Sequence, residues 1–100
     1  MELGILVNTD KNLPDVIGLT KSALSKGYKV VIFSMDEGTK LLGNSSFTGL
    51  GDLDGVEISY CDHSARDCDA KTEGLSEKIK GGSQVNNAMM NQSTNKIVVL

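Results

Sequence analysis

The sequence predicts a three-layer α/β domain of the flavodoxin-like or Rossmann-like kind, with a four- to five-stranded, mainly parallel sheet. Short apolar runs rich in β-branched residues recur along the chain, and helical or turn-rich segments separate them in the order β-α-β-α-β-α-α-β. The runs are continuous rather than alternating, which is typical of strands covered on both faces. At 100 residues and 39% hydrophobic composition, the chain is expected to form one domain over residues 1–100.

The amino-terminal part of the chain predicts two strands and two helices. LGILV, residues 3–7, is the first apolar run. A helix is predicted over the following NLPDVIGLTKSALSKG, because a proline suits its first turn and Gly27 its end. YKVVIFSM, residues 28–35, predicts the second strand. DEGTKLL, residues 36–42, predicts a short helix with two acids at its start.

The middle of the chain predicts an irregular segment, a third strand and a short helical stretch. Residues 43–55 are rich in turn residues and are expected to be irregular. VEISYC, residues 56–61, predicts the third strand. The following SARDCDAKTEGLSEKIKGG is predicted to carry one or two helical turns, with Leu75 and Ile79 as an i,i+4 pair.

The carboxyl-terminal part predicts one more helix and one more strand. SQVNNAMMNQS, residues 83–93, places Val85, Ala88 and Met89 on one helical face. KIVVL, residues 96–100, is a final apolar run and completes the predicted sheet.

Composition excludes several classes of function. The net charge is -3 and no Lys/Arg cluster marks a phosphate footprint, so nucleic acid is not an expected partner. No apolar run approaches the roughly 20 residues that cross a bilayer, and the first residues do not resemble a signal peptide. We therefore expect a cytoplasmic protein without a membrane partner, in which two cysteines do not form a disulfide framework.

The predicted strands end in polar or reactive residues, where open α/β sheets place their ligands. The third strand ends at Cys61, and His63, the only histidine of the chain, follows at once. A thiolate at Cys61 is the predicted nucleophile, with His63 as its catalytic helper. The residues expected to stabilise the thiolate or bind an anion lie on the same edge: Asn8, Thr9, Asp62, Ser64, Ala65 and Arg66.

Other interpretations of the two cysteines stay open. Cys61 can be a small packing residue, because buried cysteine often behaves as a hydrophobe. A metal site made of Cys61, His63 and Cys68 would match no standard zinc spacing. A redox pair of Cys61 and Cys68 would need the chain between them to turn back. No phosphate-loop or dinucleotide motif is present, so no cofactor and no metal are predicted.

Two stretches carry a resemblance to a known family. GVEISYCDHSAR, followed by GGSQVNNAMMNQSTNKIVVL, resembles the DsrE/DsrF-like group of small sulfur-relay proteins, which includes the TusD-type subunits of tRNA thiolation. The likeness extends over nearly the whole chain. It includes the strand–helix opening, a cysteine at the end of a mid-chain strand, and a last apolar strand after the polar turn at 95–97.

The resemblance implies a single DsrE-like domain that holds sulfane sulfur as a persulfide on Cys61 and passes it to a partner thiol. An active protein would be sulfurtransferase-like, with unidentified donor and acceptor proteins as partners. The family likeness also implies a homo-oligomer, a trimer or hexamer. The alternative is a non-catalytic oligomeric binding module of the same fold. That module would hold a small anion or nucleotide at the carboxyl edge of the sheet, with Cys61 only packing.

Overall fold

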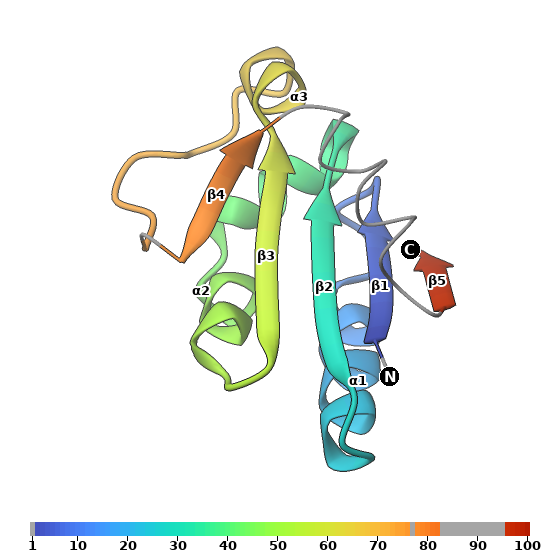
Figure 1. The fold of residues 1–100 in the computed structure, drawn as a ribbon. Helices are drawn as coiled ribbons and strands as arrows, with labels where there is room; N and C mark the ends of the chain where they lie inside the picture. Colours follow the sequence, from blue (N-terminus) through green and yellow to red (C-terminus); the bar gives the residue numbers. More distant parts are fainter. Residues whose placement is uncertain (1, 77, 83–95) are drawn as a thin grey trace.

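In the part of the chain that the structure describes, the sheet has five strands, all parallel, in the order β4-β3-β2-β1-β5 (Figure 1). This computed structural model describes residues 2–76, 78–82 and 96–100. The architecture confirms the predicted three-layer α/β class. Of the four to five strands that were predicted, five are present in the described residues. The strands are β1 (Glu2–Val7), β2 (Lys29–Ser34), β3 (Val56–Cys61), β4 (Ile79–Gly82) and β5 (Lys96–Val99).

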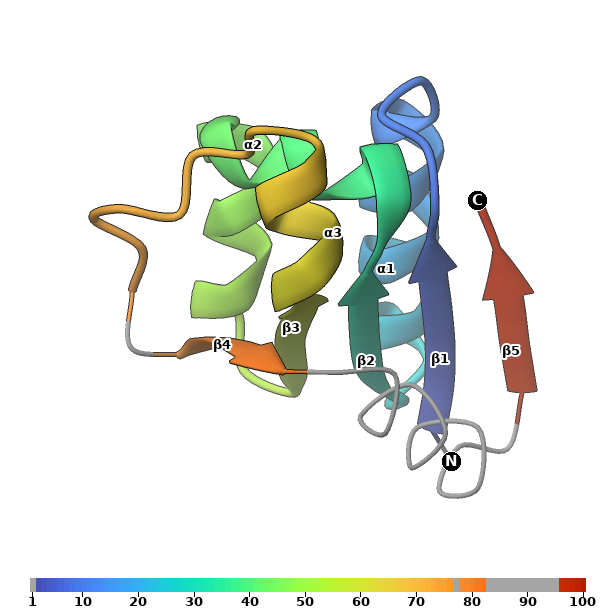
Figure 2. The same ribbon diagram turned by 90° about the horizontal axis from the view of Figure 1, so that it is seen from above.

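The described helices lie on one side of the sheet (Figure 2). The long helix α1 packs on β1 and β2, and α3 packs against η1 near the carboxyl ends of the strands. No helix in the described part of the chain is long and apolar enough to span a membrane. The helices are α1 (Leu13–Ser25), α2 (Ser45–Thr48) and α3 (Asp62–Asp67), with the 3-10 helices η1 (Asp36–Gly43) and η2 (Gly49–Asp52).

The central strand β2 explains why the apolar runs are continuous in sequence. Val30 and Ile32 are fully buried in the main core beneath α1. Phe33 is also fully buried, but in a second apolar cluster. Because successive side chains of a strand point to opposite faces, this second cluster lies on the other face of the sheet. Because both faces of β2 are buried, no side of the strand faces solvent, and its sequence is continuously apolar instead of alternating between apolar and polar residues.

Helix α1 ends as the sequence predicts. Gly27 adopts a positive φ of 82°, which costs glycine little because it has no Cβ. The N–H of Gly27 donates to the carbonyl of Leu24 at 3.0 Å, and the N–H of Tyr28 donates to Ala23 at 3.0 Å. This pair of bonds is the Schellman motif, which satisfies the last carbonyls of the helix and turns the chain into β2.

The helical pairing predicted for Leu75 and Ile79 is wrong. Helix α3 ends at Asp67, because Asp69 takes a positive φ of 53° and the N–H of Ala70 donates to Ala65 at 2.8 Å. This is again a Schellman ending. Ile79 instead begins β4, is buried, and lies opposite Ile58. Two apolar residues four apart fit a helix and a loop–strand junction equally well.

The stretch predicted to be irregular, residues 43–55, contains the short helices α2 and η2. Asn44 caps α2, since its side-chain oxygen accepts from the N–H of Ser46 at 2.9 Å. Phe47 and Leu50 then reach the main core. In this stretch a residue type common in turns, Asn44, begins a helix instead of a loop. The helix predicted over 83–93 lies outside the described residues.

Two glycines with opposite surroundings test this packing. We expect Gly38→Ala to lower the free energy of unfolding by more than about 2 kcal/mol, because an added Cβ would overlap the carbonyl of Val7. The matched control is Gly18→Ala, inside α1, where nothing lies within 4 Å of the added Cβ. It should raise stability by about 0.5–1 kcal/mol through helix propensity. Urea unfolding of both variants measures this, and equal effects would contradict the packing of η1 on β1.

Candidate functional site

Cys61 is the last residue of β3, at the carboxyl edge of the sheet where the sequence predicted it. Its side chain is 3% exposed and packs with Phe33 in the second apolar cluster. Leu6, Val31 and Met35 complete this cluster. On the adjacent strand β4, Gly82 is paired with Cys61. The thiol is therefore covered by apolar side chains of β1 and β2, whereas β4 offers no side chain beside it.

Helix α3 starts immediately after Cys61 and determines where His63 lies. The His63 Nε2 atom is 3.1 Å from Asp67 Oδ2, and these side chains are 77% and 64% exposed. An exposed i,i+4 pair of this kind contributes little to stability. In this structure the imidazole is directed along the surface of α3, and its predicted catalytic role stays a prediction.

The other predicted site residues divide into two groups. Ser64 and Ala65 are buried on α3, which packs against η1. Asp62, Ala65 and Arg66 line a small cavity of 290 Å³. Asn8 and Thr9 lie at the end of β1, where Thr9 Oγ1 accepts a local bond from the N–H of Lys11 at 3.4 Å. The structure thus brings three of the predicted residues around one cavity, which Ser64, Asn8 and Thr9 do not line.

Tyr60 and Asp62 lie together beside Cys61, on the edge next to β4. A Cβ added at Gly81 would overlap the Oδ1 atom of Asp62 and would lie 2.9 Å from the Tyr60 hydroxyl. Only glycine leaves room for both groups. Burial raises the pKa of Tyr60 above its ordinary value of 10.0, and the negative charge of Asp62 raises it further. The phenol is therefore a neutral hydrogen-bonding group at physiological pH.

A second cavity at the carboxyl edge brings together residues that the sequence did not associate. It measures 460 Å³, and its charged residues are Asp10, Lys40, Asp69 and Lys71. None of these four takes part in an ion pair with the rest of the described chain. It shares Asp69 with the 290 Å³ cavity. Two lysines without carboxylate partners give this edge the capacity to hold an anion.

No sequence motif predicts that Lys40 and Lys71 line the same cavity. Lys40 belongs to the last turn of η1, whereas Lys71 follows α3. They meet because the stem of Lys71 lies over Gly43, with its Cδ 3.7 Å from a Cβ built there. This contact depends on the docking of α3 against η1, so a pattern search along the sequence could not find it.

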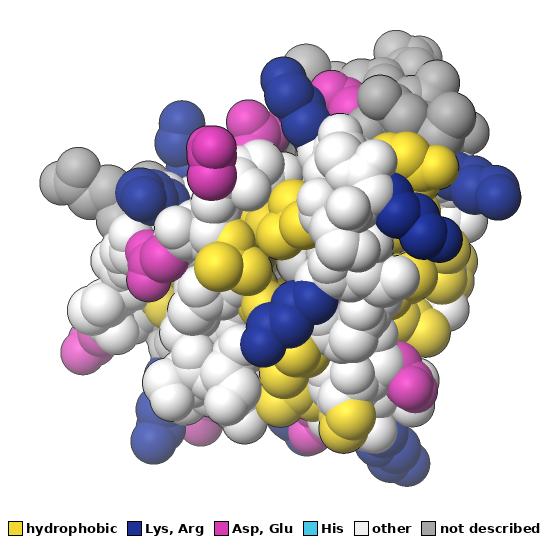
Figure 3. All heavy atoms as spheres, turned by 90° about the horizontal axis from the view of Figure 1, so that it is seen from below, with side chains coloured by type: hydrophobic (Ala, Val, Ile, Leu, Met, Phe, Trp, Pro, Cys, Tyr) yellow, Lys and Arg dark blue, Asp and Glu magenta, His cyan; other side chains and the backbone are white. Residues whose placement is uncertain are grey.

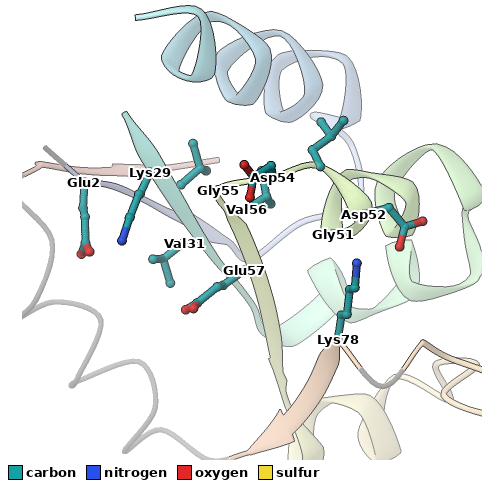
Figure 4. Close-up of a pocket in the computed structure, with 12 residues that line it drawn as sticks. Glu2, Lys29, Val31, Gly51, Asp52, Asp54, Gly55, Val56, Glu57 and Lys78 are labelled. Atoms are coloured by element: carbon teal, nitrogen blue, oxygen red, sulfur yellow. The ribbon is translucent and has the colours of Figure 1, made fainter. Parts of the chain in front are cut away.

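A larger cavity, of 620 Å³, lies at the opposite edge of the sheet. Its lining residues come from the amino ends of β1, β2 and β3, from η2 and the turn that follows it, and from Lys78 (Figure 4). Viewed from this end, charged side chains surround exposed hydrophobic ones (Figure 3). Parallel α/β sheets bind ligands at their carboxyl ends. Despite its size, this cavity is therefore the less favoured site.

The positions of the cysteine, histidine and acidic side chains bear on whether this protein could hold a metal ion or form a disulfide. No group of three His, Cys, Asp or Glu residues in the described ranges is placed to hold a metal ion. Cys61 and Cys68 are thiols that are not joined by a disulfide. Cys68 is the half-buried C-cap residue of α3. The two cysteines therefore belong to different surroundings, one apolar and one at a helix end.

The fold is similar to that of solved proteins. MTH1491 from Methanobacterium thermoautotrophicum, a protein of unknown function, matches with a TM-score of 0.78 and 13% identity, over 99% of this chain and 98% of that one. The ychN protein from E. coli matches with a TM-score of 0.72 and 15% identity over 100% of both chains. At these identities the likeness shows the fold alone. No family model and no curated protein matches the sequence.

The environment of Tyr60 predicts a pH dependence. Because the pKa of Tyr60 is raised on folding, its contribution to stability is present below the unfolded pKa and is lost as the pH rises through the higher folded pKa. Stability should fall above about pH 10, and less so in Tyr60→Phe. Asp62→Asn should move the Tyr60 pKa only part of the way back, since burial is the larger cause.

Absorbance titration of tyrosinate in a Tyr28→Phe background measures the Tyr60 pKa directly. Asp52→Asn, in the cavity at the opposite edge, is the matched control and should leave the midpoint unchanged. A Tyr60 midpoint at or below that of free tyrosine would show that the phenol is not buried beside Asp62.

Proposed function

We propose that this protein is a small sulfur carrier with a DsrE-like domain over residues 1–100, sulfurtransferase-like in its chemistry. The observation that carries the proposal is the position of Cys61, a thiol at the carboxyl end of a strand in an all-parallel sheet. Ligands and reactive groups gather at this edge in α/β proteins. The fold likeness and the resemblance of the segment around Cys61 to sulfur-relay proteins support the same assignment.

The proposed chemistry is an exchange of one sulfur atom between thiols. The Cys61 thiolate attacks the outer sulfur of a donor persulfide, a new S–S bond forms, and the donor leaves as a thiolate. A thiolate of the acceptor protein then attacks the outer sulfur on Cys61, which returns to a thiolate. The sulfane sulfur keeps its oxidation state throughout, so no external oxidant or reductant is needed.

Burial of Cys61 sets a condition on this chemistry. At 3% exposure, the sulfur is shielded from solvent, which suits the storage of a reactive persulfide but blocks direct attack. The apolar cluster must therefore open when a donor docks. Met35 is the side chain we expect to move, because it is only partly buried and methionine is flexible. Approach over Gly82 is the other route, since glycine places no side chain beside the thiol.

Intact mass spectrometry after incubation with a sulfane-sulfur donor tests the proposal. Wild-type protein should gain about 32 Da, the mass of one sulfur, and Cys61→Ser should gain nothing. The matched control is Cys68→Ser, which should load as the wild type does. Absence of the added mass on the wild type, or equal loading of Cys61→Ser, would exclude a carrier function of Cys61.

A second candidate is the non-catalytic binding module, and two observations favour it. Cys61 is buried in an apolar cluster as a packing residue would be. On the same edge, the 460 Å³ cavity presents Lys40 and Lys71, neither of which forms an ion pair with a carboxylate of the described residues. A cavity of this size accommodates a small anion or the phosphates of a nucleotide, held by charge-assisted hydrogen bonds.

Calorimetric titration with inorganic pyrophosphate at low salt tests the module. Lys71→Gln should weaken binding roughly tenfold, the effect of losing about 1.4 kcal/mol. Lys78→Gln, which removes a lysine from the opposite edge, is the matched control and should bind as the wild type does. Equal affinities of all three proteins, or no heat of binding, would rule out an anion site at Lys71.

A further inference from the structure

A groove of 560 Å³ lies between helix α1 and the outer strand β5. Most of its apolar lining belongs to the main core or packs against it, and consists of Leu3, Leu19, Ala23, Tyr28 and Val98. The two carboxyl-edge cavities, in contrast, are lined mainly by charged and polar residues. A mainly apolar lining with a few polar groups at defined positions is typical of sites for small molecules.

Two lysines lie at one end of this groove, at the amino edge of the sheet. Lys26 is the C-cap residue of α1, and Lys96 begins β5. Lys96 is paired with Leu3, a residue of the main core, and paired residues of adjacent strands point to the same face. The Lys96 side chain is therefore directed to the α1 face, where the groove lies. Neither lysine forms an ion pair with a carboxylate of the described residues.

Glu2 is the single acid among the described residues that line the groove. Because it precedes Leu3 in β1, its side chain points to the opposite face of the sheet. Figure 4 shows the Glu2 carboxylate directed away from α1, next to Lys29, with which Glu2 is paired. Among its described side chains, the groove therefore presents two ammonium groups and no carboxylate on the α1 face.

Hydrogen bonds satisfy the last carbonyls of helix α1 beside the groove. The carbonyl of Ala23 accepts from the N–H of Lys26 at 3.1 Å and from that of Tyr28 at 3.0 Å. The carbonyl of Leu24 accepts from the N–H of Gly27 at 3.0 Å. These bonds and the charge of Lys26 offset the negative end of the helix dipole. An anion in the groove would therefore meet the lysines rather than unpaired carbonyls.

We infer that this groove binds a medium-chain aliphatic carboxylate. The carboxylate group lies between Lys26 and Lys96, and the hydrocarbon chain follows Leu19, Ala23 and Val98. Ammonium groups hold a carboxylate through charge-assisted hydrogen bonds, and burial of the chain removes apolar surface from water. The site does not include the thiol of β3, so the inference goes beyond the proposed function and stands independently of it.

The length of the groove sets the length of the chain. Leu19 precedes Lys26 by seven residues, about 10 Å along a helix that rises about 1.5 Å per residue. An extended hydrocarbon advances about 1.25 Å per carbon, because its C–C bonds of about 1.5 Å are bent near 111°. A chain of about eight carbons therefore reaches from the lysines to Leu19. Octanoate is the simplest probe of this length.

Heteronuclear NMR titration with octanoate, below its micelle concentration and at low salt, tests the site. Amide shift changes should centre on Ala23, Lys26 and Val98. Hexanoate should bind roughly tenfold more weakly, because it buries two fewer methylene groups at about fourfold each. Octylamine, which has the same chain and a positive head group, should not bind in the groove. No shift changes at these residues with octanoate, or equal affinity for octylamine, would overturn the inference.

Substitutions on the two faces of the sheet separate the groove from a general effect of surface charge. Lys96→Gln should weaken octanoate binding roughly tenfold, since it removes one of the two ammonium groups. Lys29→Gln is the matched control, because Lys29 lies at the same edge but on the opposite face, beside Glu2. It should bind octanoate as the wild type does. Equal affinities of the two variants would overturn the inference.

Filling the groove provides a second test that does not depend on charge. Ser22 lines the groove from an exposed position of α1, so Ser22→Trp should fold and should lower octanoate affinity by about tenfold or more. Ser25→Trp changes an exposed position of the same helix that does not line the groove, and should bind as the wild type does. Unchanged affinity of folded Ser22→Trp would contradict an occupied groove.

Discussion

Parallel pairing of the strands is the constraint on which the other features of this structure depend. Strands that run in one direction require each connection to return from the carboxyl edge to the amino edge. The returning helix α1 therefore covers the sheet, and β2 in the centre is buried on both faces. The same constraint gathers the ends of β1, β2 and β3 at one edge, where Cys61, Asp62 and the two carboxyl-edge cavities lie.

The pleat of β3 decides the surroundings of the reactive residue. Val56 and Ile58 belong to the main core, so the odd-numbered Cys61 must face the other side of the sheet. There it meets Phe33 and lies away from the lysines of the 460 Å³ cavity. The edge thus carries two chemically different regions, an apolar one that shields a thiol and a charged one suited to an anion. Because the two regions are separate, the sulfur-carrier function is tested at Cys61 and the anion-binding function at Lys71.

Much of the fold was predictable from local sequence, because its cause is local. Apolar runs determined β1, β2, β3 and β5, and Gly27 ended α1 through a conformation that glycine adopts freely. The errors arose where the cause is not local. Ile79 joins β4 because Ile58 lies beside it, and its spacing from Leu75 is coincidental. Asp69 ends α3 in the left-handed conformation, which aspartate can adopt but which its presence in a sequence does not predict.

The sequence by itself determined the α/β class, the direction of the strands and the position of Cys61 at a strand end. The class and the strand direction follow from the order in which short apolar runs and helical segments alternate along the chain, and the position of Cys61 follows from the run VEISYC. Only the tertiary structure decided that Cys61 is buried, that His63 pairs with Asp67 on the surface, and that Lys71 joins Lys40. Those outcomes depend on which face a strand presents and on how α3 docks against η1. Both are set by packing between segments far apart in the chain.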